Sequence, residues 1–253
     1  MAHTPQKPLV KRRKGKDTNI RERAEELAAT GMPFQMAMAV ASGRLQLNDA
    51  LERMVQQDQV KRLMERHDLS RALATQIAMG HADLDTVLAR RRMEEHREQN
   101  RSRSKVVEAS VTKVPVVLGL HGKRRITAVI DSVDSYTFQV IPEKGEVEEI
   151  HKLQLKYICG VDDYKQLRKV LRTNKALSKN PLEPVEKPQD RYSCGDRRLF
   201  QYLDRGKEVE ITLLEGEIIR GVVVWFSRFE FCLRVRSRAN VVILRHALHN
   251  LTS

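Results

Sequence analysis

The sequence is poor in aromatic residues and in cysteine. Aromatic side chains make up 5% of its 253 residues, so any hydrophobic core has to be built mainly from aliphatic residues. The three cysteines, Cys159, Cys194 and Cys232, are odd in number and show no Cys-X-X-Cys spacing. This pattern argues against a disulfide framework and against a thiolate metal site, and it predicts reduced structural thiols.

Long apolar runs and catalytic motifs are also missing. No stretch of about 18 apolar residues could span a bilayer, and no charged start with an apolar core resembles a secretory signal. The eight histidines are scattered, and no serine or cysteine lies in a nucleophile motif or a Gly-rich phosphate loop. We therefore expect a soluble, cytoplasmic protein that is not an enzyme, needs no cofactor or metal, and has no membrane partner.

Positive charge is what the sequence has in excess. Its 46 Lys and Arg against 33 Asp and Glu give a formal net charge of +13. Such a charge attracts nucleic acid by electrostatic steering and by counterion release. Residues 1–20 combine many cations with few apolar residues and predict a disordered basic arm that contacts phosphates, with a solubilising tail as the alternative. The cations assigned to this arm are Lys11, Arg12, Arg13, Lys14 and Lys16.

Residues 21–105 show helical spacing of apolar residues and an internal repeat. Two matching segments end at Gly43 and at Gly80, 37 residues apart. Each predicts a helix that ends at glycine, a short turn, and a second helix that starts near Asn48 or Asp85. We predict a small helical domain whose methionines are core residues, with a promiscuous binding groove as the alternative. These methionines are Met32, Met36, Met38 and Met54.

Beyond residue 110 the apolar residues alternate with polar ones, as is typical of β-strands. Four or five short strands fit residues 110–160. Residues 161–195 return to a helical pattern and end in a proline-containing linker, and a second set of strands fits residues 196–253.

The two sets of strands repeat. Phe229 lies 93 residues after Tyr136, and Arg245 lies 93 residues after Lys152. A shared offset in two separated segments indicates two copies of one module.

The second set resembles the bacterial Sm-like RNA chaperone Hfq family. The resemblance covers about 45 residues. It rests on four features. The first strand ends in a turn at Gly216, and the second strand contains Gly221. Phe229 comes before the third strand, and Arg245-His246-Ala247 comes before the last.

The resemblance implies a strongly bent five-stranded barrel, ring assembly by pairing of strands four and five across subunits, and a uridine pocket. It implies that Phe229 stacks on the base and that Arg245 and His246 contact base and phosphate. The remaining candidate RNA-binding residues are Arg228, Tyr136 and Lys152. Taken singly, Phe229 and Tyr136 are better explained as core aromatics of a small barrel, and His246 as a hydrogen-bonded strand residue. The combination of these residues with the net charge of +13 is what favours RNA.

Departures from the family pattern limit what can be carried over. Ser227 and Arg228 stand where the family has an acid and an amide, so the hydrogen bonds that orient the pocket are expected to differ. Thr212 replaces a tyrosine, which removes the reason to expect an adenine preference. In the first set, His151 precedes Lys152, so that site is expected to be degenerate or to serve as a pairing partner.

The sequence thus predicts an α+β protein in which a helical-repeat domain is followed by two small, strongly bent, five-stranded Sm-like β-barrels. Its predicted function is non-catalytic binding of single-stranded RNA, as an Hfq-like RNA chaperone or post-transcriptional regulator. One alternative is an oligomerisation scaffold that pairs β-edges of identical chains. The other is a DNA- or ribosome-associated factor that uses the helical domain.

Overall fold

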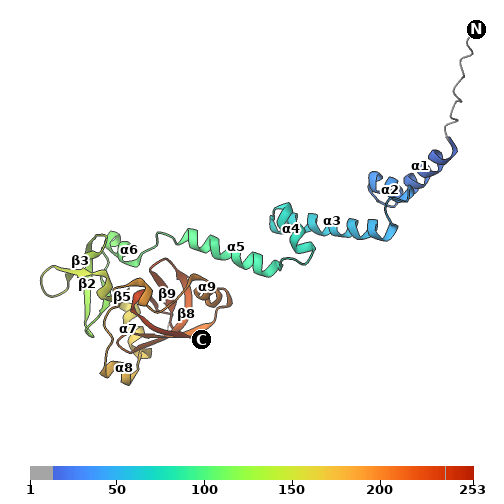
Figure 1. Cartoon of the computed structure of the whole chain (residues 1–253). Helices are drawn as coiled ribbons and strands as arrows, with labels where there is room; N and C mark the ends of the chain where they lie inside the picture. The colour runs from blue at the N-terminus through green and yellow to red at the C-terminus, as the bar shows by residue number, and fades with distance from the viewer. Residues whose placement is uncertain (1–13, 237) are drawn as a thin grey trace, which may run out of the picture. The chain divides into compact units, whose positions relative to one another are not determined.

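The computed structural model describes residues 14–236 and 238–253, with the backbone alone for residues 14–18 (Figure 1). Lys11, Arg12 and Arg13 of the predicted basic arm lie outside the described residues. Lys14 and Lys16 belong to the first turns of a helix. The chain divides into two compact units, one ending at Leu88 and the other beginning at Ala89. No helix of the described residues is both long and apolar enough to cross a membrane.

Helices form the first unit and repeat at the offset seen in the sequence. The second and fourth helices both have eight residues, and their bounds differ by 37, as do the starts of the third and fifth. Gly43 and Gly80 follow the short helices with φ of 72° and 73°, a left-handed conformation that favours glycine. The helices are α1 (Lys14–Ala29), α2 (Phe34–Ala41), α3 (Leu47–His67), α4 (Arg71–Ala78) and α5 (Leu84–Gln99), of which α5 begins in the first unit and lies mostly in the second.

The predicted methionine core is confirmed. Met32 is buried together with Ala24, Ala37, Val40 and Ala50. The other three methionines are partly buried against this cluster, namely Met36, Met38 and Met54.

The second unit contains one 11-stranded sheet with the order β11-β7-β8-β9-β10-β5-β1-β2-β3-β4, and β6 pairs with β8 beside this path. Every pairing is antiparallel. Its helices are α6 (Lys105–Thr112), α7 (Val161–Val170), α8 (Lys175–Lys179) and α9 (Asp196–Arg205). The strands are β1 (Val116–Leu120), β2 (Arg125–Val133), β3 (Thr137–Pro142), β4 (Glu148–His151), β5 (Leu155–Gly160), β6 (Arg172–Thr173), β7 (Glu208–Leu213), β8 (Glu217–Phe226), β9 (Glu230–Arg234), β10 (Asn240–Leu244) and β11 (Leu248–Thr252).

The 93-residue repeat is visible in the strand pairing. Strands β1–β5, which we call the first half, pair in the order β5-β1-β2-β3-β4, and strands β7–β11, the second half, pair in the matching order β11-β7-β8-β9-β10. The β-bulges match as well: β2 shifts register between Ile130 and Ser132, and β8 shifts between Val223 and Trp225. Bulges bend strands and are specific to a fold, so the two halves are copies in structure as well as in sequence.

The prediction of two small closed barrels is wrong. Closure of the second half would require β10 to pair with β11, but β10 pairs with β9 and with β5 of the first half. Strand β11 pairs with β7. The hydrogen-bonding edge that would have closed a barrel is used to join the halves, and the result is one continuous open sheet.

Two hydrophobic cores lie on opposite faces of the strands where the halves meet. Along β10, Val241 and Ile243 belong to one core, whereas Val242 and Leu244 belong to the other. Alternate residues of a strand point to opposite faces, so each face is covered separately. Helix α9 contributes to the first core and helix α6 to the second. Phe226 is buried in the first core and Trp225 in the second.

A buried charge cluster also joins the halves. Lys156 of β5 is 1% exposed, and its ammonium group bonds to the carboxylates of Glu215 and Glu217 in the second half. Glu215 also accepts hydrogen bonds from the backbone amides of Gly122, at 2.6 Å, and Lys123, at 3.0 Å. Burial opposes ionisation of Glu215, but these hydrogen bonds outweigh it and lower the pKa of the carboxyl group. One buried ammonium is therefore shared between two carboxylates where the halves meet, and Glu217 Oε2 is left without a hydrogen-bond partner among the described residues.

Candidate nucleic-acid interface

A tight turn between β8 and β9 displays an aromatic side chain. The amide of Ser227 donates to the carbonyl of Glu230 at 2.8 Å and closes this turn. Phe229 lies in the turn with 65% of its surface exposed, and the Arg228 guanidinium lies 5.1 Å from the centre of its ring. An exposed ring beside a cation offers a stacking surface for a flat, electron-rich group such as a nucleic-acid base.

Arg245 is fixed beside this turn. Its guanidinium donates to the carbonyls of Ser227, at 2.6 Å, and Cys194, at 2.9 Å, and to the carboxylate of Asp196, at 2.8 Å. The side chain is 17% exposed. A planar guanidinium held in this way presents a fixed direction to a ligand.

The first half builds the same arrangement. Tyr136 is 74% exposed in the turn before β3, and its carbonyl accepts a hydrogen bond from the amide of Lys152 at 2.8 Å. The carbonyl of Phe229 accepts the matching bond from the amide of Arg245 at 2.9 Å. The Lys152 ammonium bonds to the carbonyl of Asp134, the counterpart of Ser227. Both aromatic residues thus lie outside the hydrophobic cores.

His246 lies apart from this arrangement. The signature Arg245-His246-Ala247 forms a 3₁₀ turn, η3, between β10 and β11. In it, His246 Nε2 lies 2.9 Å from the carbonyl oxygen of Leu155, where the halves meet. Burial lowers the pKa of His246 to about 4, so the ring is neutral at pH 7. His151 of the first half instead caps the matching 3₁₀ turn, η1 (Lys152–Gln154), through a bond to the amide of Leu153.

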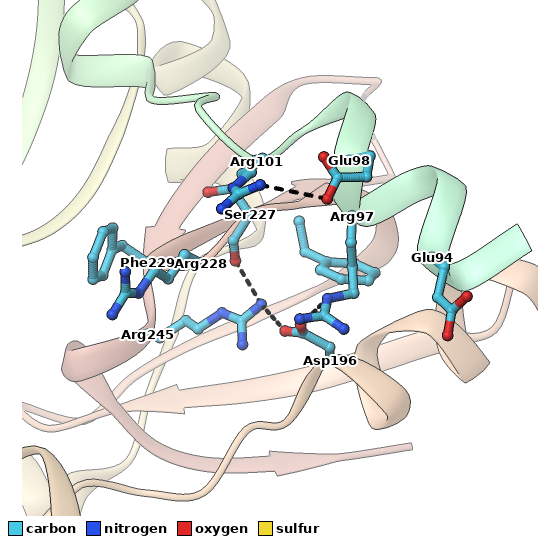
Figure 2. A pocket seen from close by; sticks show the side chains of 10 residues that line it. Glu94, Arg97, Glu98, Arg101, Asp196, Ser227, Arg228, Phe229 and Arg245 are labelled. Atoms are coloured by element: carbon cyan, nitrogen blue, oxygen red, sulfur yellow. Dashed lines mark hydrogen bonds and ion pairs between the residues drawn. The ribbon is translucent and has the colours of Figure 1, made fainter. Parts of the chain in front are cut away.

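A pocket of about 920 Å³ adjoins Phe229 and Arg245 (Figure 2). Four arginines and three acids contribute to its wall, so it is polar and carries net positive charge. Figure 2 shows Phe229 and Arg228 at one side of the pocket and helix α5 at the other. The lining residues are Glu94, Arg97, Glu98, Arg101, Asp196, Phe226, Ser227, Arg228, Phe229 and Arg245.

Sequence reasoning did not place the lining residues from α5 and the turn after it beside Phe229. In the sequence they belong to a segment with i,i+4 pairs of opposite charge, such as Arg90 with Glu94, a pattern that is typical of a solvated helix face. Their role depends on how α5 packs. His96 of α5 accepts a hydrogen bond from the amide of Phe226 at 3.2 Å, and its ring lies 4.4 Å from the Phe226 ring. No local pattern encodes such a long-range contact.

Asp196 at the start of α9 links two of the arginines. One carboxylate oxygen lies 2.8 Å from Arg245 and the other lies 3.0 Å from Arg97. Glu230, the first residue of β9 after the turn, is 2% exposed, and its carboxylate accepts a hydrogen bond from the amide of Lys105. Burial raises the pKa of Glu230 to about 7. Asp196 therefore holds Arg97 and Arg245 in position, and Glu230 holds the start of helix α6.

Nothing in the described residues assembles three or more His, Cys, Asp or Glu side chains into a metal site. The three cysteines are free and buried. Burial raises the pKa of Cys159 to about 12 and of Cys232 to about 11, so both stay thiols at neutral pH. The chemistry that the described site offers is stacking and charge-assisted hydrogen bonding.

No protein-family model, curated protein or solved structure matches the chain.

Proposed function

We propose that this protein binds single-stranded RNA without catalysis, as a chaperone or post-transcriptional regulator of the kind that its resemblance to the Hfq family implies. A base stacks on Phe229, while Arg228 and Arg245 contact the base edge or the phosphate. The net charge of +13 adds a salt-dependent, sequence-independent attraction.

The observation that carries this proposal is the pairing of an exposed aromatic ring with an anchored cation, repeated in both halves. A ring that is two-thirds exposed loses the free energy of burial that a core position would provide. Its position next to a fixed guanidinium is what recognition of a nucleotide requires, because a nucleotide combines a flat base with an anionic phosphate.

The test is a titration of uridine-rich, adenine-rich and structured RNA against duplex DNA at two salt concentrations. We expect tighter binding of single-stranded RNA than of duplex DNA. The Phe229→Ala variant should lose about 1 to 3 kcal/mol of binding free energy, the contribution of one stacked base.

Phe34→Ala is a matched control, since Phe34 is also half-exposed but lies in α2 of the first unit. Equal RNA affinity of the wild type and Phe229→Ala would contradict the assignment of this site. A preference for duplex DNA would favour the alternative in which the helical unit reads DNA.

A second candidate function, a self-assembling scaffold, is favoured by the outer strands of the sheet. In the described part of the chain, β4 pairs with β3 alone and β11 with β7 alone. These two strands are the counterparts of β10 and β5, which pair where the halves meet. Identical chains could therefore associate by the same strand pairing.

A further inference from the structure

Helix α5 lies outside both repeated halves, yet it forms one wall of the pocket beside Phe229 (Figure 2). Its position is fixed by three contacts with the second half. Met93 packs against the hydrophobic core, His96 bonds to the amide of Phe226, and Arg92 pairs with Asp204 through two hydrogen bonds of 3.2 Å. The side chains that α5 directs into the pocket therefore have a defined place.

Arg97 and Arg101 are the cations on this wall of the pocket. Arg97 lies in the last turn of α5, and Arg101 lies in the turn that follows the helix. Their side chains are 56% and 79% exposed. Each has an acidic neighbour, Asp196 at 3.0 Å from Arg97 and Glu98 at 3.6 Å from Arg101.

These arginines retain capacity to bind an anion. A guanidinium has five N–H donors, and one carboxylate occupies only part of that set. Exposed ion pairs are also weak, so a polyanion that releases counterions can compete with them.

Resting on the proposed function, we propose that Arg97 and Arg101 bind the phosphates that flank the base stacked on Phe229. The ligand is a single RNA strand whose base lies on the turn and whose backbone crosses the pocket toward α5. The second half thereby has a phosphate contact that the repeated module alone does not supply.

The experiment measures the dissociation constant of a short uridine oligonucleotide over a salt series. Loss of one phosphate contact on a single strand reduces the slope of log affinity against log salt by about 0.7. The double variant R97Q/R101Q should therefore reduce the slope by about 1.4. Phe229→Ala should weaken binding by about 5- to 150-fold at every salt concentration and leave the slope unchanged.

R220Q/R236Q is the matched control, because it removes the same charge from two other exposed, acid-paired arginines of the same unit. R97K/R101K keeps the charge and should restore the slope. An unchanged slope in R97Q/R101Q, or an equal reduction in the control, would overturn the inference while the proposed function stands. Absence of RNA binding by the wild type would overturn both. Thermal unfolding of each variant verifies that the fold is kept.

Discussion

His246 is a partly buried, neutral side chain that couples the contact between the halves to pH. In the unfolded chain its pKa is near 6.5, whereas burial lowers it to about 4 in the folded protein. Between these values the unfolded state binds a proton that the folded state does not, so stability falls as pH falls from 6.5 to 4. Above pH 6.5 this residue contributes no pH dependence.

The His246→Gln variant should lose this pH dependence. A glutamine amide can still donate to the Leu155 carbonyl but does not titrate. The fall in the free energy of unfolding between pH 7 and pH 4 should be smaller than in the wild type by on the order of 3 kcal/mol. Urea unfolding at a series of pH values measures this fall in the free energy of unfolding.

His249→Gln is the control for this prediction, since His249 is exposed on β11. It should retain the wild-type pH dependence. An identical pH profile for His246→Gln and the wild type would show that His246 is not the titrating group.

At the scale of elements, the close approach of β8 to β9 requires a glycine at position 221. A Cβ atom at Gly221 would lie 2.6 Å from the carbonyl oxygen of Arg234 on the neighbouring strand β9. That atom belongs to the backbone, so the strands would have to move apart. The counterpart in the first half is Ala128 of β2, where a methyl group is accommodated.

Gly221→Ala should therefore destabilise the protein by about 1 to 3 kcal/mol, the usual cost of overpacking. The reciprocal change Ala128→Gly removes a buried methyl group and adds the backbone entropy of glycine, so it should cost about 1 to 2 kcal/mol. Chemical denaturation compares the two variants. A Gly221→Ala protein as stable as the wild type would mean that β8 and β9 separate freely.

The strands and both repeats could be predicted from sequence, because alternation and shared offsets are local patterns. Closure into barrels could not. It depends on whether β10 pairs with β11 or with β5, and all three strands have suitable apolar residues. Phe229 and Arg245 were proposed from their motif, whereas the pocket that brings Arg97 and Arg101 near them depends on the long-range packing of α5.

At the scale of the whole molecule, the two outer strands allow head-to-tail association. Val241 lies opposite Cys159 between β10 and β5. The 93-residue offset places Glu148 of one copy opposite Thr252 of another. A mixture of Glu148→Cys and Thr252→Cys proteins should form a disulfide-linked heterodimer on a non-reducing gel.

This association is expected to be weaker than the pairing of β10 with β5. Arg198 and Tyr192 already donate hydrogen bonds to the Leu251 carbonyl of β11, and a further strand competes with them. Glu143→Cys mixed with Thr252→Cys is the control, because Glu143 lies outside β4. The native cysteines are buried and should not react. Equal cross-linking in both mixtures, or a monomeric wild type at micromolar concentration, would exclude this assembly.

The pairing of β5 with β10 has a further consequence, because both strands belong to one polypeptide. A covalent connection replaces association between molecules with a high effective concentration, so dilution does not separate the halves. The Tyr136 and Phe229 turns are therefore always present in equal number. A substitution in one turn leaves the other unchanged, so the two turns are free to acquire different ligand preferences within a single chain.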